Sequence, residues 1–302
     1  MRIGIDLGGS KIEIIALDET DAVRLRRRVA TPVDDYEATL RTICTLVQDA
    51  ERELGTRASV GIGTPGSRSP ATGLMRNANS VCLNDHPLQR DLEHLLAREI
   101  RIANDANCFA LSEAEDGAAA GAACVFGVIL GTGVGGGLVI AGAALDGANG
   151  IAGEWGHNPL GEEANAVAPS CYCGRRGCIE SYLSGPGLVA DHLRHGECES
   201  DVPAIVAGAA VGNVACEETM ARYEGRLARA LATVINILDP DVIVLGGGVS
   251  NIERLYNNVP ALWRQHIFSD VVRTRLVRHR HGDSSGVRGA ARLWGRPPSG
   301  TV

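Results

Sequence analysis

The beginning of the chain alternates short apolar runs with polar turns, a pattern that predicts a small meander of strands. The runs Arg2–Leu7 and Ile12–Leu17 are separated by Gly-Gly-Ser-Lys, and Val23–Ala30 follows as a third candidate strand. Short apolar runs bounded by glycine are typical of strands joined by a tight turn. Apolar residues then recur at helical spacing over Asp35–Leu54. We predict that the rest of this half contains strands over Ala58–Gly63 and Glu99–Ala103 and a helix over Ala106–Ala120.

The second half of the chain repeats this order. Val125–Leu130 and Leu138–Ala141 are predicted strands on either side of the glycine-rich segment Gly131–Gly137. A long helix is predicted from Asn213 to Leu238, followed by a buried strand over Asp241–Leu245 that ends in three glycines. Two halves that each open with a strand, a glycine turn and another strand predict a duplicated α/β architecture.

Length and composition indicate two domains. The chain has 302 residues, 45% of them hydrophobic, which is enough for a large buried core. The small-residue segment Gly117–Ala123 is the expected crossing point. We therefore predict an N-terminal α/β domain over 1–116, on which 288–302 packs back, and a C-terminal α/β domain over 117–287.

Charge and hydropathy argue against two kinds of partner. The apolar runs are interrupted by charges or glycines before they reach the length of a membrane span, and the first run is too short for a signal peptide. The net charge of -7 argues against nonspecific nucleic-acid binding, which requires a basic surface. We expect a cytoplasmic protein without a membrane or nucleic-acid partner.

Four residues of the second half have the spacing of a zinc site. They follow the pattern H-x13-C-x-C-x4-C and are His157, Cys171, Cys173 and Cys178. One imidazole and three thiolates complete the tetrahedral coordination of Zn²⁺. The metal would fix a loop that presents Glu154 and one edge of His157 to a ligand.

Two other interpretations of these cysteines remain open, a disulfide and separate core thiols. Disulfides persist in oxidising compartments, whereas this chain is expected in the cytoplasm. Six further cysteines stand singly, mostly in apolar or helical stretches, as inert buried thiols do: Cys44, Cys82, Cys108, Cys124, Cys198 and Cys216. Close cysteine spacing in such a chain favours metal.

The two glycine turns are candidate phosphate-binding loops. The first offers backbone N–H groups, a hydroxyl and the only lysine of the chain, in Gly8, Gly9, Ser10 and Lys11. Asp6 stands at the end of the preceding strand, where it would bind Mg²⁺ through water. The second turn, with Thr132 and Gly133, would hold a polyphosphate from the opposite side.

Alternatives to this interpretation have different structural requirements. The residues Gly131, Gly133 and Gly136 fit the dinucleotide fingerprint G-x-G-x-x-G, but that fingerprint opens a helix, and here a predicted strand follows. A plain hairpin also explains either turn taken alone. A nucleotide held between two hairpin turns indicates an actin-like architecture instead, and Gly247 and Gly248 would then allow close approach of the adenosine.

Seven segments of the chain resemble the ROK sugar kinases, and within them the bacterial fructokinase or mannokinase branch. The segments are Asp6–Lys11, Asn77–Ser80, Asn104–Asn107, Gly131–Gly133, Gly153–His157, Cys171–Gly174 and His281–Gly286. The cysteine cluster joined to Glu-x-Gly-His is the most specific of them. The resemblance implies an actin-like (ribonuclease H-like) ATPase fold, with two duplicated α/β domains and a cleft between them.

The resemblance also implies an activity and the roles of individual residues. It implies ATP-dependent phosphorylation of a hexose, with Mg²⁺ accompanying ATP and Zn²⁺ structural, and Asp105 falls at the position of the general base. The positions that hold sugar hydroxyls are Asn79, Asn104, Glu154, His157 and Glu180. Asp105 directly follows a predicted strand, where ligands of open sheets bind, although a helix N-cap is the alternative role for that residue.

Fructose is the expected sugar, with conversion to fructose 6-phosphate, and mannose is a further substrate on this interpretation. Two departures from the family pattern concern Ser10, which replaces threonine, and the linker Leu160–Ser170, which is short for the fructokinase branch. A kinase for glucose or an N-acetylated hexosamine is one alternative. A sugar-sensing transcriptional regulator is another, but it would need a helix-turn-helix in front of the strand at Arg2. A homodimer is expected by default.

Overall fold

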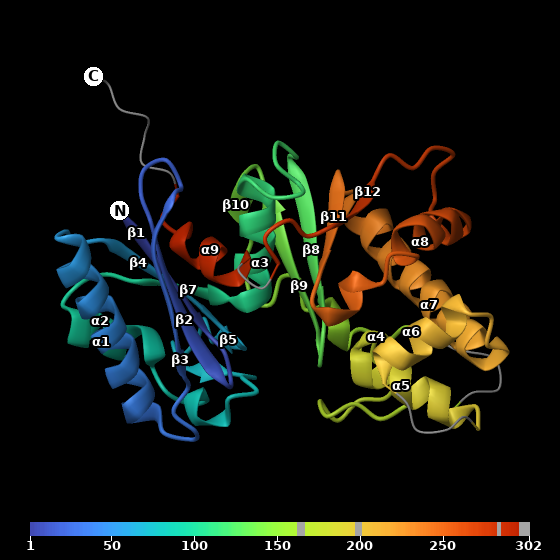
Figure 1. The fold of residues 1–302 in the computed structure, drawn as a ribbon, viewed down its shortest axis with the longest axis horizontal. Coiled ribbons are helices and arrows are strands. Elements are labelled where there is room, and N and C mark those ends of the chain that lie inside the picture. Colours follow the sequence, from blue (N-terminus) through green and yellow to red (C-terminus); the bar gives the residue numbers. More distant parts are fainter. Residues whose placement is uncertain (162–166, 197–200, 283–284, 296–302) are drawn as a thin grey trace. The chain divides into compact units, whose positions relative to one another are not determined.

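The computed structural model describes residues 1–161, 167–196, 201–282 and 285–295 (Figure 1). The chain divides into two compact units. Unit 1 comprises Met1–Asp116, Gly137–Ala152 and Asp283–Val302, and unit 2 comprises Gly117–Gly136 and Gly153–Gly282. The predicted division into 1–116 and 117–287 did not include the return of Gly137–Ala152 to the first unit. Part of the predicted packing of 288–302 concerns 296–302, which lie outside the described residues.

Unit 1 contains a five-stranded mixed sheet in the order β3-β2-β1-β4-β7. The strands are β1 (Arg2–Leu7), β2 (Lys11–Leu17), β3 (Val23–Ala30), β4 (Ser59–Thr64) and β7 (Arg101–Asn104). β1, β2 and β3 form the predicted antiparallel meander, and β4 and β7 run parallel to β1. The interior strands are buried on both faces, as expected for a sheet covered by helices on both sides.

Helices cover both faces of this sheet (Figure 1). On one face α1 (Tyr36–Leu54) and α2 (Leu88–Leu96) bury a large apolar cluster with β1, β2 and β4. On the other face α9 (Ser285–Ala291) packs on β2, and α3 (Asp105–Glu115) lies against α9. The short elements of this unit are the hairpin β5 (Ser67–Arg68) with β6 (Met75–Arg76) and the 3₁₀ turn η1 (Val81–Leu83).

Glycines within the strands allow α9 to approach the sheet closely. A Cβ on Gly4 of β1 would lie 2.1 Å from the carbonyl oxygen of Val287, and one on Gly61 of β4 would lie 1.9 Å from that of Ala290. Any larger residue at either position would therefore push α9 away from the sheet. Since α9 also contacts α3, this packing fixes the helix that begins with Asp105.

The second sheet has the order β10-β9-β8-β11-β12. Its strands are β8 (Cys124–Leu130), β9 (Val134–Ile140), β10 (Ala143–Ala144), β11 (Val242–Gly246) and β12 (Arg275–Arg278). β8, β11 and β12 are parallel, and β10 pairs antiparallel with β9. In chain order the two sheets have the same strand arrangement, so the predicted duplication is confirmed.

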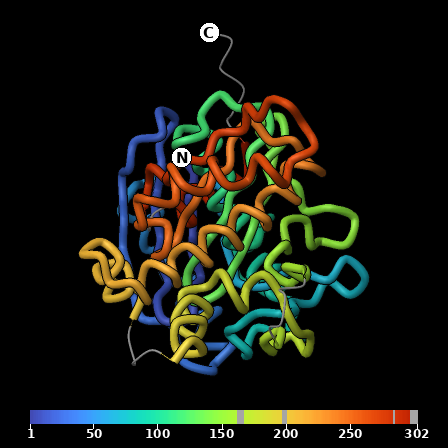
Figure 2. Tube along the Cα trace, turned by 90° about the vertical axis from the view of Figure 1, so that its right-hand side faces the viewer, coloured from blue at the N-terminus to red at the C-terminus, as the bar shows by residue number. Residues whose placement is uncertain are grey.

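The helices of unit 2 surround the long helix α7. They are α4 (Glu180–Leu183), α5 (Gly185–Arg194), α6 (Val202–Ala210), α7 (Val214–Leu238) and α8 (Leu255–Trp263), with the 3₁₀ turns η2 (Trp155–His157), η3 (Gly248–Asn251) and η4 (Arg264–His266). α7 crosses the view of Figure 2 diagonally in orange and packs against α6 and α8. The Asn213 side chain caps its first turn, so the predicted helix from Asn213 to Leu238 is confirmed. Among the described helices, none is long and apolar enough to span a membrane.

Two predicted elements differ from the observed bounds by more than two residues. β9 begins at Val134 rather than Leu138, so Gly135–Gly137 belong to a strand and not to the turn. The strand tolerates these glycines because its neighbours are close: a Cβ on Gly136 would lie 2.6 Å from the carbonyl oxygen of Gly153. The helix predicted over Ala106–Ala120 spans Asp105–Glu115 and stops before the glycine that follows its C-cap.

Candidate functional site

The first glycine turn is held by hydrogen bonds on both of its arms. The N–H of Gly8 donates to the carbonyl oxygen of Lys11 at 3.0 Å. Thr31, which follows β3, donates its N–H to the carbonyl of Ser10 at 3.1 Å and its hydroxyl to that of Gly8 at 2.7 Å. The turn is thus supported by the adjacent strand. The sequence motif did not indicate this role of Thr31, because it depends on the pairing of β2 with β3.

Asp6 lies beside this turn in an environment that disfavours its charge. Burial raises the pKa of Asp6 to about 6, with further contributions from the carboxylates of Asp105 and Glu13, against the smaller effect of Lys11. Glu13 lies directly opposite Asp6 in the β1–β2 pairing and is itself fully buried. Its charge is balanced by arginines on β3, with Arg28 Nε 2.6 Å away. A bound cation would stabilise the ionised form of Asp6.

Asp105 is the first residue of α3 and directly follows β7, at the carboxyl end of that strand. The N-cap is Asn104, whose side-chain oxygen accepts from the N–H of Ala106 at 2.9 Å. The alternative in which Asp105 is the N-cap is therefore wrong by one position, although its own Oδ1 also accepts from Ala106 at 2.8 Å. The Asn104 amide nitrogen donates to the carbonyl of Gly66 at 2.9 Å, so this side chain joins the start of α3 to the loop after β4.

The loop that carries Asn79 is fixed by a neighbouring asparagine. Asn84 accepts from the N–H of Ala78 at 2.9 Å and donates to its carbonyl at 3.0 Å, while Asn79 itself is exposed. Ser80 follows at the N-cap of η1, but its hydroxyl makes no capping bond and is buried without a hydrogen-bond partner. It lies 3.4 Å from the position of a Cβ on Gly9, beside the first glycine turn. The motif Asn77–Ser80 by itself predicted no separate role for this hydroxyl.

In unit 2 the second glycine turn and the glycines after β11 lie at one edge of the sheet. The N–H of Gly131 donates to the carbonyl of Gly133 at 3.0 Å, and Thr132 between them is exposed. Gly247 has φ +80°, and a Cβ there would lie 2.4 Å from the carbonyl oxygen of Leu130. Gly248 follows at the start of η3 with open space around it. The structure thus brings these four predicted nucleotide contacts together.

Glu180 connects this turn to the cysteine loop. Its Oε2 accepts from the N–H of Val134 at 2.9 Å, and a Cβ on Gly133 would lie only 2.7 Å from the same oxygen. Its Oε1 lies 4.0 Å from the sulfur of Cys171. Glu180 therefore stabilises the second glycine turn. The sequence predicted a sugar contact for this residue but not this structural role.

The four predicted zinc ligands converge on one point. Their ligand atoms all lie within 4.8 Å of one another, and the residues are His157, Cys171, Cys173 and Cys178. The distance from Cys171 Sγ to His157 Nδ1 is 3.6 Å, as is that from Cys173 Sγ to Cys178 Sγ. Backbone bonds shape the loop, including one from the N–H of Cys171 to the carbonyl of Arg175 at 2.8 Å. A disulfide would require sulfurs about 2.0 Å apart.

The loop before this cluster is fixed by Trp155. The buried indole donates from Nε1 to the carbonyl of Gly135 at 3.2 Å and meets the ring of Phe126 edge-on at 5.6 Å. Glu154 precedes it, exposed and without a capping bond of its side chain. With Nδ1 of His157 facing Cys171, its Nε2 lies 3.2 Å from the hydroxyl of Tyr172. Tyr172 is thus a neighbour of the predicted sugar-binding nitrogen that sequence reasoning missed.

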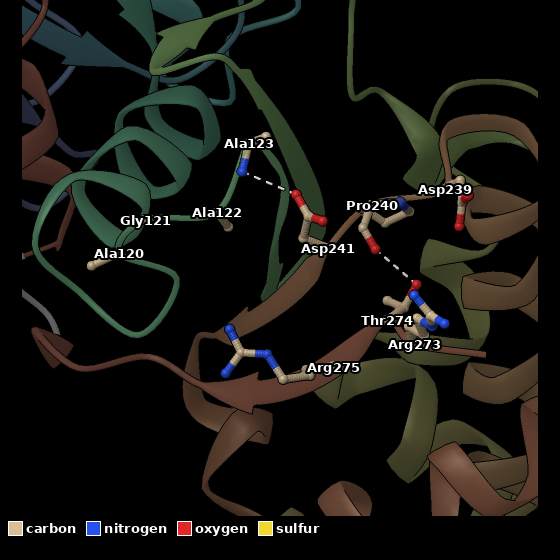
Figure 3. A pocket seen from close by; sticks show the side chains of 10 residues that line it. All are labelled: Ala120, Gly121, Ala122, Ala123, Asp239, Pro240, Asp241, Arg273, Thr274 and Arg275. Carbon is tan, nitrogen blue, oxygen red and sulfur yellow. Dashed lines mark hydrogen bonds between the residues drawn. The ribbon is translucent and has the colours of Figure 1, made fainter. Parts of the chain in front are cut away.

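A cavity of about 590 Å³ lies at the opposite edge of the second sheet (Figure 3). It is lined by the segments before β8, β11 and β12, with Asp241 near its centre. The Asp241 carboxylate accepts from the N–H groups of Ala123 and Cys124 at 2.9 Å. This cavity lies at the amino ends of the strands. None of the predicted site residues lines it.

Fold and comparisons together identify the class of protein. Two sheets of the same strand order, each with a glycine turn after its first strand, form the actin-like ATPase fold, and the predicted fold class is confirmed. The model of the ROK family matches residues 2–296, so this chain belongs to the ROK family. The resemblance to the ROK sugar kinases is thereby confirmed.

Relatives and solved structures cover nearly the whole chain. The N-acetyl-D-glucosamine kinase of Yersinia pseudotuberculosis is 40% identical over 299 residues, which are 97% of this chain and 98% of that protein. The Salmonella gallinarum protein of the same name is 39% identical over 97% of this chain and 99% of its own length. The ROK hexokinase from Thermus thermophilus has a TM-score of 0.85 at 30% identity, covering 97% of this chain and 96% of that one. A ROK glucokinase from Streptomyces griseus in complex with glucose and AMPPNP has a TM-score of 0.75 at 26% identity, covering 97% and 98%.

Proposed function

We propose that this protein is an ATP-dependent sugar kinase that phosphorylates a hydroxyl of N-acetyl-D-glucosamine. Family membership supports sugar phosphorylation, and the two relatives described above, which match almost end to end, carry that hexosamine in their names. An N-acetylated hexosamine was one of the substrates that the sequence left open. The expectation of fructose or mannose rests on the resemblance alone and stays a prediction.

The observation that carries the proposed phosphoryl transfer is the position of Asp105. Its carboxyl group stands at the carboxyl end of β7, only partly buried, in the unit that also contains the first glycine turn and Asp6. As the sugar oxygen forms its bond to the γ-phosphorus, the bond from that phosphorus to the bridging oxygen breaks and ADP leaves. Asp105 takes the hydroxyl proton, which is the role of the carboxylate base in phosphoryl transfer.

The nucleotide contacts follow from the two turns. In unit 1 we assign the phosphates to the backbone of the first turn, with its residues Gly8, Gly9, Ser10 and Lys11. The hydroxyl of Ser80 is added here because it is buried beside Gly9 without a partner. In unit 2 we assign Thr132 and Gly133 to the phosphates and Gly247 and Gly248 to the adenosine. Mg²⁺, when bound, spreads the charge of the phosphates, and Asp6 would hold it through water.

The cysteine cluster fits zinc. With bonds of about 2.3 Å to sulfur and about 2.0 Å to nitrogen, a tetrahedral zinc site has ligand atoms about 3.5 to 3.8 Å apart. The two pairs described above, Cys171 with His157 and Cys173 with Cys178, are both 3.6 Å apart. The ion would supply no chemistry to the transfer and would fix the loop from Glu154 to Cys178 instead.

The sugar contacts are proposed at the positions implied by the family. Asn79 and Glu154 are exposed and available, and His157 offers the nitrogen that points away from the cysteines. Asn104 uses its amide nitrogen for Gly66 and its oxygen for Ala106, so we assign it the second acceptor site of that oxygen. Glu180 would share its carboxylate between the turn and the sugar.

A substrate panel tests this proposal. ADP release with magnesium ATP is measured against N-acetylglucosamine, N-acetylmannosamine, glucose, mannose and fructose, and we expect the highest kcat/KM with N-acetylglucosamine. Loss of the hydrogen bonds to the acetamido group leaves polar groups of the site unpaired, so glucose should be poorer by about tenfold or more. A higher kcat/KM for fructose or mannose would replace the hexosamine with the first prediction, and no ADP release with any sugar would refute the kinase itself.

A further inference from the structure

Tyr172 is an exposed aromatic residue between two of the proposed zinc ligands. It separates Cys171 from Cys173, and its side chain is 82% exposed. A short turn shapes the backbone here, since the N–H of Gly174 donates to the carbonyl of Cys171 at 3.1 Å. Zinc bound by both cysteines would fix the backbone on each side of the tyrosine. The exposed ring is therefore attached to a well-defined segment of the loop.

The side chain of Tyr172 is held by His157. Its hydroxyl lies 3.2 Å from Nε2 of His157, and the two rings meet edge to face with their centroids 5.3 Å apart. Nδ1 of His157 faces Cys171, so a zinc ion bound at Nδ1 leaves the ring proton on Nε2. Nε2 then donates to the tyrosine oxygen, and the hydroxyl keeps its own proton for a ligand. Because the side chain is already held, its contact with a ligand would cost little conformational entropy.

Two carboxylates belong to the same group of side chains. Glu154 is the N-cap of η2 and stands three residues before His157, and side chains at this spacing lie on one side of a 3₁₀ turn. Oε1 of Glu180 lies 4.0 Å from the sulfur of Cys171, the residue before Tyr172. All of these residues belong to unit 2. We call Glu154, His157, Tyr172 and Glu180 the Tyr172 cluster.

The Tyr172 cluster offers the two kinds of partner that an acetamido group needs. The carbonyl oxygen of that group only accepts hydrogen bonds and its N–H only donates, whereas a sugar hydroxyl does both. Ionised Glu154 and Glu180 can only accept. The donors of the cluster are therefore Nε2 of His157 and the hydroxyl of Tyr172. Since the first donates to the second, the tyrosine proton is the one left for a carbonyl oxygen, and the ring beside it offers an apolar surface to the acetamido methyl group.

We propose that Tyr172 is a further sugar contact and that it selects the acetamido group of the substrate. Its hydroxyl donates to the acetamido carbonyl, and Glu154 accepts the acetamido N–H. This inference rests on the proposed function and deepens it, because it names the side chain that distinguishes N-acetylglucosamine from glucose. The two sugars differ only in the acetamido group, so a contact to that group affects one of them and not the other.

Calorimetry with the two sugars tests the proposal. The loss of one neutral hydrogen bond weakens binding by about 3- to 10-fold, so Tyr172→Phe should raise the Kd of N-acetylglucosamine by that factor and change the Kd of glucose by less than about twofold. Tyr172→Ala also removes the ring, so it should reduce the preference further. The zinc content of both variants should equal that of the wild type, because Tyr172 is not one of the ligands.

Arg175→Gln is the matched control. Arg175 is exposed in the same loop and donates from Nη1 to the backbone carbonyl of His157 at 3.3 Å. Its loss should shift the loop and affect both sugars alike, so the ratio of the two Kd values should stay at that of the wild type. Asn79→Ala is measured beside it, because the side-chain amide of Asn79 in unit 1 also offers a donor and an acceptor.

The outcomes separate this inference from the proposed function. An unchanged ratio of Kd values in both Tyr172→Phe and Tyr172→Ala would overturn the assignment, as would an equal loss of preference in Arg175→Gln. Loss of the preference in Asn79→Ala alone would give the acetamido contact to that residue instead. A wild type that binds glucose as tightly as N-acetylglucosamine would refute the proposed substrate and the assignment together.

Discussion

The carboxylate of Glu180 accepts the N–H of Val134 at 2.9 Å, and this bond joins the helix after the cysteine cluster to the residue after the second glycine turn. Val134 is buried, so its N–H has no ready replacement from water. The proposed sugar side and the proposed nucleotide side of unit 2 therefore share one side chain.

Replacing Glu180 should separate its two roles. Glu180→Ala leaves the Val134 N–H unpaired, at a cost of about 1 to 3 kcal/mol, and we expect KM to rise by about tenfold for both ATP and sugar. Glu180→Gln keeps an oxygen for that N–H, so only the KM for sugar should rise. Steady-state kinetics with each substrate varied in turn measures both values. An unchanged KM for ATP in Glu180→Ala would contradict the conclusion that Glu180 stabilises the nucleotide-binding turn.

The neutral variant Asp105→Asn should keep sugar binding and lose turnover. A carboxylate base typically contributes about 10² to 10⁴ in rate, because the amide cannot accept the hydroxyl proton. We expect kcat to fall within that range, while the sugar dissociation constant from calorimetry changes little. Since Asn104 and not Asp105 is the N-cap, the helix should remain intact. Near-normal turnover of this variant would exclude Asp105 as the general base.

Because Asp6 is buried, its ionised carboxylate should lower the stability of the fold near neutral pH. Its folded-state pKa of about 6 lies above the ordinary 3.8, so its contribution to stability is complete below the ordinary value and is lost as pH rises through 6. We expect Asp6→Asn to be more stable than the wild type by about 2 to 3 kcal/mol at about pH 7.5, in EDTA, with the gain shrinking toward pH 4. Thermal melts over this pH range measure the difference.

Asp18 is the control, because its pKa is shifted in the opposite direction from that of Asp6. Hydrogen bonds from Thr20, first of all from its side chain, lower the pKa of Asp18 to about 2. Its contribution is present above the ordinary value and is lost as pH falls, so Asp18→Asn should lower the melting temperature at neutral pH and matter less in acid. A loss of stability in Asp6→Asn at neutral pH would show that the carboxylate is not disfavoured there.

Ser80→Ala should affect the nucleotide without affecting the fold. The hydroxyl has no partner to lose in the ligand-free protein, so the melting temperature should stay within a degree or so. A hydrogen bond to a charged phosphate contributes about 1.5 to 3 kcal/mol, so kcat/KM for ATP should fall by about tenfold or more. Ser112→Ala is the matched control, because that hydroxyl is also buried without a partner but lies on α3. Equal effects of both variants would refute a specific role for Ser80.

Metal analysis of the purified protein should find about one zinc per chain. Cys173→Ser removes one of the four ligands and should reduce the zinc content and weaken the sugar affinity, while Cys82→Ser, outside the cluster, should change neither. A preparation free of metal and fully active would contradict the zinc site. Fewer free thiols than expected in a preparation without metal would favour the disulfide alternative.

Much of the fold was predictable because patterns among neighbouring residues determine its strands and helices. The meander over Arg2–Leu7, Ile12–Leu17 and Val23–Ala30 and the long helix to Leu238 follow from alternation, helical spacing and capping, which are properties of neighbouring residues. The cluster of His157 with three cysteines was likewise predictable, since its spacing is short and few chemistries require it.

Other features required distant residues to meet. The sequence predicts a turn at the glycines of β9, because only the structure shows that the carbonyl of Gly153 fills the space that a side chain would occupy. The bracing of the turns by Thr31 and Glu180, and the unpartnered hydroxyl of Ser80, likewise depend on segments far apart in the chain.

By itself, therefore, the sequence determined the elements, their duplicated order and the residue types of the candidate site. Tertiary structure alone decided which side chain caps α3, which nitrogen of His157 faces the cysteines, and how strongly the charge of Asp6 is disfavoured. The physical reason is that periodicity and capping act between near neighbours, whereas burial, close approach and electrostatic shifts depend on packing.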